Sequence, residues 1–369
     1  MNSHEKFEKM LSLEAYHSRD EIPVCPMMLT TVGTVAEMTQ KEICENIDNW
    51  LTALDKTITR IGHPDALMPT CPGDIIFTMG LPAKKPGVEL DDQALYQFIE
   101  KPYFDDPSEY KKIYDMGWNN WYFSYMADIQ NPKMTMQEVG ARYHLVGENL
   151  GKSFRYLYQN GIEPEAHAFI YPIYDNLSLI RSMGEFTCDM YEDPGPIMDI
   201  IHKYQPLDDE QNIQRIKATG GTRVWNAAMR SSAVFASPAL FDEYIWPTMK
   251  AMILRYYEAG IQTVLHADAN WLPMLKHFTE VPRGSMLIEL DGATDIFAAY
   301  DILQGYQAIR GDVPATMFAY SSPEEVSEYC DKLLTMGMKG GFMLASGCEI
   351  PLNAKIENIK AMMDSVKSK

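Results

Sequence analysis

Eight short apolar runs, separated by longer amphipathic stretches, are the feature that most constrains the fold of this chain of 369 residues. Runs of this kind are typical of buried strands. They cover residues 23–29, 65–70, 166–171, 223–229, 261–268, 286–291, 307–311 and 341–346. Helical patterns fill most of the gaps, for example residues 239–259, ended by Gly260, and residues 323–336, ended by Gly337. Strands that alternate with helices pair in parallel, so eight such units predict an α/β fold, a closed (β/α)8 TIM barrel.

The stretch between the second and third runs is too long for a simple crossover. Residues 73–161 are therefore expected to hold an insertion with several helices and an irregular Pro- and Asp-rich piece, KPYFDDPSEY, over one barrel end. The chain contains neither a low-complexity linker nor an internal repeat, and it starts with a charged amphipathic stretch. We expect one domain over residues 1–369, with N-terminal helices before the barrel.

The charge balance excludes two classes of partner. The chain has 32 Lys and Arg against 51 Asp and Glu, a formal net charge of −19. Such a protein has no sequence-independent grip on nucleic acid or anionic lipid, because both require clustered basic residues. No apolar run approaches the ~20 residues of a membrane span, and the amphipathic start lacks a signal-peptide core. The six cysteines are scattered without a CxxC pair, so we expect reduced thiols in a soluble, cytoplasmic enzyme.

Polar residues gather where the apolar runs end, which is where TIM barrels carry their chemistry. The fifth run ends in His266 and Asp268, the sixth ends in Glu289 and Asp291, and the eighth leads into Cys348. Residues two apart in a strand share a face, so both pairs can point into the barrel mouth. Imidazole, thiolate and carboxylate are zinc ligands, so a zinc site is one interpretation of these residues, although the spacing alone does not favour it. The alternative is that His266 is a hydrogen-bonded core histidine and Cys348 a small buried apolar residue.

A substrate pocket is expected beside the same strand ends. Several aromatic residues gather there, and although each large ring is more often a packing residue, such a cluster favours at least one in a pocket wall. The residues we expect to contact substrate are Met27, Tyr171, Trp225, Asn226, Asn270 and Trp271.

Five segments carry a resemblance to a known family. They are IPVCPMMLTTVG (22–33), DALMPTCPGDIIFTMGLPAKKPG (65–87), LSLIRSMGEFTCDMYEDPG (177–195), FASPALFDEYIWPTMKAMI (235–253) and GGFMLASGCEIPLNAKIENIKAMM (340–363). In this order and spacing they resemble the uroporphyrinogen decarboxylase superfamily, whose members end in a G-G-F-I-L-x-x-G-x-x-I-P pattern. The resemblance implies a (β/α)8 barrel over nearly the whole chain, in a group that also holds zinc-dependent, corrinoid-linked methyltransferases.

Two positions in this sequence distinguish between the branches of that superfamily. The decarboxylase branch carries arginines just after the first strand, and residues 28–33 (MLTTVG) contain no basic residue. The methyltransferase branch carries His-x-Cys at the fifth strand end and Gly-Cys at the eighth; His266 and Cys348 match, whereas position 268 is Asp. An oxygen ligand is acceptable to zinc. The resemblance therefore implies a zinc ion on His266 and Cys348, with Asp268, Glu289 or Asp291 as the third ligand.

The implied function is transfer of a methyl group from a small methylated substrate, with an aromatic methyl ether as the leading candidate, to the reduced cobalt of a corrinoid (cobalamin) carried by a partner protein. His266, Asp268 and Cys348 would hold zinc, and Asp291 or Glu289 would orient the substrate or supply a proton. The alternatives are a methylcobalamin:thiol (coenzyme M-type) methyltransferase, a metal-free decarboxylase, and a non-catalytic barrel that binds a corrinoid protein or small ligand. The methyl donor, the acceptor and a homodimeric state are left open by the sequence.

Overall fold

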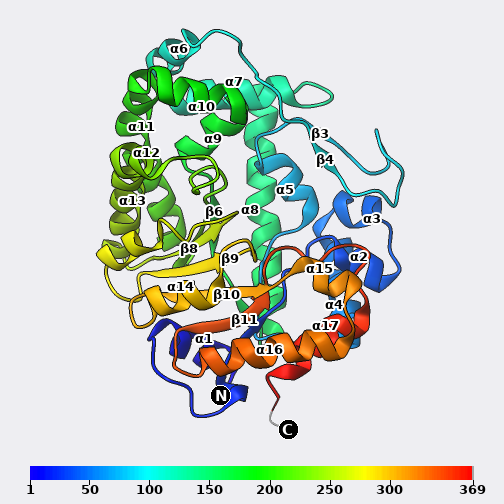
Figure 1. Ribbon diagram of the computed structural model, residues 1–369. Coiled ribbons are helices and arrows are strands. Elements are labelled where there is room, and N and C mark those ends of the chain that lie inside the picture. Colours follow the sequence, from blue (N-terminus) through cyan, green and yellow to red (C-terminus); the bar gives the residue numbers. More distant parts are fainter. Residues whose placement is uncertain (368–369) are drawn as a thin grey trace.

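A curled parallel sheet forms the centre of the molecule, shown in Figure 1 for the computed structural model, which describes residues 1–367. Seven strands pair in parallel in the order β1-β11-β10-β9-β8-β7-β6. Their bounds are β1 (Val24–Cys25), β6 (Ala168–Ile170), β7 (Arg223–Ala227), β8 (Gln262–Ala267), β9 (Met286–Leu290), β10 (Ala308–Val313) and β11 (Phe342–Ser346). Every residue of β7, β9, β10 and β11 is buried, as expected for strands covered by helices on the outside and side chains on the inside.

A separate pair of short strands fills the gap between the two edge strands of this sheet, β1 and β6. β2 (Ala66–Leu67) pairs in parallel with β5 (Glu163–Pro164), which runs on into β6. On its other side, the Asp65 N–H donates to the Val24 carbonyl at 2.9 Å, which links β2 to β1. Each of the eight predicted runs thus contains a strand of the ring, and the predicted TIM-barrel-like α/β fold is confirmed. The strands at 24–25 and 66–67 are shorter than their runs because Pro23, Pro26 and Pro69 cannot donate to a ladder.

Helices surround the sheet (Figure 1). In chain order they are α1 (Ser3–Leu11), η1 (Arg19–Glu21), α2 (Thr31–Ala36), α3 (Gln40–Glu45), α4 (Ile47–Ile61), α5 (Pro72–Thr78), α6 (Glu109–Met116), α7 (Trp118–Ile129), α8 (Met136–Gln159), α9 (Ile173–Arg181), α10 (Met183–Glu192), α11 (Gly195–Ala218), α12 (Pro238–Leu240), η2 (Phe241–Ile245), α13 (Trp246–Glu258), η3 (Leu275–Glu280), α14 (Ile296–Leu303), α15 (Ala315–Tyr320), α16 (Pro323–Gly337) and α17 (Ile356–Ser365). None of the helices in the described part of the chain combines the length and the apolar character that crossing a bilayer demands.

The two helices predicted from sequence are present. The helix expected over 323–336 is α16, which starts with a capping box between Ser322 and Glu325. The helix expected over 239–259 is divided into α12, the π-helical turn η2 and α13. The widened turn lies just before Pro247, which has no N–H to bond back one turn.

The long stretch after β2 contains the expected helices. A short antiparallel pair, β3 (Ala83–Lys84) and β4 (Gln97–Phe98), separates α5 from α6 and α7. The 24-residue α8 returns the chain to β5, so the end of the predicted 73–161 insertion serves as a barrel crossover helix. Arg142 and Asn149 of α8 both donate to Asp74 of α5 at 3.0 Å, which fixes α5 against the crossover.

The N-terminal helix α1 covers the end of the barrel at which the strands begin. Lys6 of α1 lies 3.0 Å from Asp65, which precedes β2. The Arg223 guanidinium, at the start of β7, lies 4.3 Å from the centre of the Phe7 ring and 2.5 Å from Glu163. Because these contacts are at the amino ends of the strands, the carboxyl ends remain as the place for a site.

Candidate active site

Three ionisable side chains lie in one row across the sheet. The register places His266 of β8 opposite Glu289 of β9, and Glu289 opposite Arg310 of β10. Paired residues of neighbouring strands point to the same face, so all three enter the barrel. His266 Nδ1 lies 2.6 Å from Glu289 Oε2, and Arg310 Nε lies 3.8 Å from Glu289 Oε1. Glu289 and Arg310 are completely buried, which makes this a polar row inside an apolar barrel.

A second buried carboxylate shares the same guanidinium. Glu165, just after β5, places Oε1 2.6 Å from Arg310 Nε. Burial raises the pKa of Glu165 to about 8; Arg310 opposes that rise and Glu289 adds to it. Burial also acts against ionised Glu289, but the charges of Arg310 and His266 outweigh it and lower the pKa of that carboxyl. One guanidinium thus stabilises one carboxylate, Glu289, and Glu165 keeps a proton at neutral pH.

The other nitrogen of His266 faces the barrel mouth, the carboxyl ends of the strands. His266 Nε2 lies 3.3 Å from Asp268 Oδ1, and the partly buried Cys348 thiol lies beside the imidazole. Burial alone would lower the pKa of His266, but Asp268, Cys348 and Glu289 outweigh it and raise that pKa well above its usual value. The surrounding groups therefore favour a cation on this side of His266, either a proton on Nε2 or a metal ion bound to it.

A glycine allows Cys348 to come this close. A Cβ at Gly347 would lie 2.8 Å from the carbonyl carbon and oxygen of Asp291, which is closer than real Cβ atoms come to backbone. The backbone before Cys348 therefore passes directly over the loop that follows β9, and only glycine fits there.

The donor types fit the zinc ion that the resemblance implies. Nitrogen, oxygen and sulfur are all zinc ligands, and His266 has its far nitrogen held by a carboxylate, as metal-binding histidines usually do. As the side chains stand, however, no group of three or more His, Cys, Asp or Glu residues within 1–367 is positioned to hold a metal ion. A bound ion would have to draw Asp268 and Cys348 together.

Two of the predicted substrate residues lie beside His266. The Trp225 indole packs on the imidazole, with ring centres 5.3 Å apart, and its Nε1 donates to Glu289 Oε2 at 3.1 Å. Tyr171, directly after β6, meets Trp225 edge to face at 6.1 Å. Together the two rings form an aromatic wall next to the open nitrogen of His266.

The other predicted residues are used differently. Asn226 lies on the outer face of β7, with Nδ2 3.2 Å from the Met252 sulfur of α13, so it does not reach His266. The prediction for Asn226 is wrong because its neighbour Trp225 takes the inward face and side chains alternate along a strand. Trp271 is fully buried against Phe278, with ring centres 5.8 Å apart, and acts in packing.

Three further predicted residues hold backbone in place. Asp291 accepts the N–H of Ala269 at 2.7 Å and of Ala293 at 2.8 Å, so both carboxylate oxygens join loops. Asn270 accepts the N–H of Leu272 at 3.0 Å, and the Met27 N–H donates to Ser346 Oγ at 2.9 Å. Glu289, predicted to be catalytic, lies behind His266 and positions it.

Sequence reasoning missed Arg310 and Glu165. A charged residue inside a strand run, as in QAIRG, was the available signal, because such a residue must find a partner when it is buried. What the sequence lacked was the register that places Arg310 opposite Glu289.

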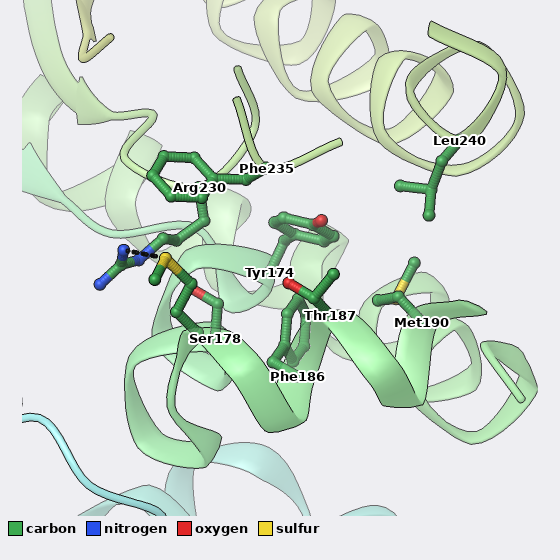
Figure 2. Close-up of a pocket in the computed structure, with 9 residues that line it drawn as sticks. Tyr174, Ser178, Phe186, Thr187, Met190, Arg230, Phe235 and Leu240 are labelled. Atoms are coloured by element: carbon green, nitrogen blue, oxygen red, sulfur yellow. Dashed lines mark hydrogen bonds between the residues drawn. The ribbon is translucent and has the colours of Figure 1, made fainter. Parts of the chain in front are cut away.

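A small pocket lies beside the mouth (Figure 2). Its lining comes from α9, α10, α12 and the loop after β7: Tyr174, Ser178, Met183, Phe186, Thr187, Met190, Arg230, Phe235 and Leu240. Figure 2 shows Arg230 next to Phe235, and its guanidinium lies 5.2 Å from the centre of that ring. None of the residues predicted to bind substrate or metal lines this pocket.

Comparisons with known proteins agree with this barrel. The family model for uroporphyrinogen decarboxylase (URO-D) matches residues 187–369, which contain His266, Asp268, Glu289, Arg310 and Cys348. This match over residues 187–369 confirms the resemblance given by the sequence motifs. A methyltransferase from Methanosarcina mazei has a similar solved structure, with a TM-score of 0.72 and 13% sequence identity over 99% of this chain and 98% of that chain. At that identity the likeness establishes the fold. A comparison with curated protein sequences finds no match.

Proposed function

We propose that the protein is a methyltransferase that moves a methyl group from an aromatic methyl ether to the reduced cobalt of a corrinoid held by a partner protein. The match of residues 187–369 to the URO-D family model and the fold shared with a methyltransferase support this class of reaction. The observation that carries the proposal is His266, whose Nδ1 is fixed by Glu289 while its Nε2 faces Asp268 and Cys348.

His266, Asp268 and Cys348 are the residues we propose as ligands of a zinc ion. When bound, zinc supplies a Lewis acid that stabilises the negative charge on the departing ether oxygen. Because an unactivated methyl ether has a poor leaving group, such stabilisation is what the reaction most needs.

The chain's own residues prepare the site. Glu289 accepts from His266 Nδ1 and so keeps the lone pair of Nε2 directed at the mouth. Arg310 holds the other oxygen of Glu289 inside the barrel, at 3.8 Å. The wall formed by Trp225 and Tyr171, whose rings meet edge to face, offers apolar surface to an aromatic ring and excludes water from the ether.

Metal analysis and a methyl-transfer assay test the proposal together. We expect about one zinc ion per chain in the purified protein. We also expect the protein to transfer the methyl group of 2-methoxyphenol to free reduced cobalamin. Cys348→Ala should lose both zinc and turnover, whereas Cys188→Ala, which removes an exposed thiol in α10, should keep both. Full activity of Cys348→Ala would contradict the assignment.

The same assay separates the alternatives. A methylcobalamin:thiol methyltransferase would methylate a thiol and leave the ether intact. A metal-free decarboxylase would be undisturbed by chelators, and a non-catalytic barrel would bind without methyl turnover.

A further inference from the structure

A strap formed by residues 82–104 runs between α5 and α6 and includes β3 and β4. Near the middle of the strap, the Asp92 carbonyl accepts the N–H of Lys41 in α3 at 3.0 Å. At its far end, the Tyr103 N–H donates to the Ile180 carbonyl of α9 at 2.9 Å. The strap thus joins a helix that follows β1 to a helix that follows β6, on the same side of the barrel as the mouth (Figure 1).

Glu100 is the charged anchor of the strap. Its Oε1 accepts the N–H of Met183, in the first turn of α10, at 2.8 Å. Its Oε2 lies 2.6 Å from Arg230 Nη2, in the loop after β7. That loop is itself fixed, because the Arg230 N–H donates at 3.0 Å to the buried carboxylate of Asp175. One carboxylate therefore connects the strap to two elements of the barrel mouth.

Tyr96 is turned inward from this strap. Leu95 and Gln97 are exposed, whereas Tyr96 and Phe98 are partly buried with their rings 5.3 Å apart, the alternation expected of an extended segment. Burial raises the pKa of the Tyr96 hydroxyl, and Glu349, Tyr171 and Cys348 lie close enough to add to that rise. Among residues 1–367 the Tyr96 hydroxyl has no hydrogen-bond partner, so it is free to bond a ligand.

We propose that the strap closes the mouth over the His266 site, that the Glu100–Arg230 ion pair holds it closed, and that the Tyr96 hydroxyl donates a hydrogen bond to an oxygen of the bound methoxyaromatic compound. The identity of that compound rests on the proposed function; the closing of the strap does not. A lid of this kind must open for substrate entry, and a partly exposed ion pair is weak enough to allow it.

Hydrogen exchange measured by mass spectrometry on the purified full chain, without substrate, tests the anchor. Glu100→Gln keeps an oxygen for the Met183 N–H but removes the charge facing Arg230. We expect exchange in residues 82–104 to become about threefold to tenfold faster. Asp105→Asn, a matched loss of charge at an exposed residue just past the strap, should change nothing. Equal exchange in Glu100→Gln and the wild type would overturn the anchor.

Binding of 2-methoxyphenol, measured by calorimetry, tests Tyr96. Tyr96→Phe keeps the ring, and the loss of one hydrogen bond should weaken binding by about fivefold to tenfold. Tyr103→Phe is the matched control, since that hydroxyl bonds to Asp128 at 3.2 Å. Unchanged binding by Tyr96→Phe would overturn its role. A wild-type protein that binds no methoxyphenol would refute the substrate class and the role of Tyr96, while the exchange result would still decide whether Glu100 and Arg230 hold the strap in place.

Discussion

Replacement of Arg310 by Met removes the one cation that two buried carboxylates share. Arg310 is completely buried, 2.6 Å from Glu165 and 3.8 Å from Glu289, and its outer nitrogens reach the Ser346 and Cys25 carbonyls at 3.4 and 3.5 Å. Methionine fills most of the space but takes the guanidinium away from both carboxyl groups and leaves Glu289 with only His266 and the Trp225 N–H, and breaking a buried ion pair in this way costs about 3–5 kcal/mol. Urea denaturation at pH 7 should show this loss. A loss below about 1 kcal/mol would refute the electrostatic account.

Double variants identify which carboxylate carries the charge. Because burial raises the pKa of Glu165 to about 8, that group is mostly neutral at pH 7. Adding Glu289→Gln to Arg310→Met should therefore restore more stability than adding Glu165→Gln. The opposite order would mean that Glu165 is the ionised partner.

The remaining predictions concern proton linkage and packing. The folded protein keeps a proton on Glu165 that the unfolded chain releases above its usual pKa of 4.5. This group's contribution to stability should therefore fall as pH rises from 4.5 to about 8. In Glu165→Gln, the urea midpoint should no longer show this decrease with pH. Burial and Arg223 lower the pKa of His167 to about 3, so its contribution should be lost as pH falls from 6.5 towards 3, and His167→Gln should flatten the decline in midpoint. Gly73→Ala places a Cβ 2.3 Å from the Cys44 carbonyl oxygen and should cost about 2 kcal/mol in thermal denaturation, whereas Gly147→Ala, with nothing within 4 Å, should be neutral or slightly stabilising.

Alternation along strands made much of this barrel predictable. Apolar runs bounded by polar residues located the strands, and the two-residue spacing of His266 and Asp268 correctly placed them on one face, 3.3 Å apart. Adjacent residues of a strand cannot share a face. If Trp225 points into the barrel, Asn226 must therefore point outward. The error at Asn226 was avoidable from the sequence.

Other parts of the site depend on distant pairing. Glu165 and Arg310 meet only because the closed ring brings the β5 end across from β10, and no local pattern encodes that distance. The strap is similar, since Tyr96 lies in an exposed segment whose position depends on the Glu100 contacts with Met183 and Arg230. Long-range contacts of this kind require the register and the loop path, which hydrophobic periodicity does not contain.

The close approach of Gly347 to Asp291 makes the position of the Cys348 thiol depend on a neighbour that has no side chain. Any side chain at that position must push the following segment outward, and Cys348 would retreat from the imidazole with it. Efforts to give this barrel a new substrate must therefore leave this glycine untouched.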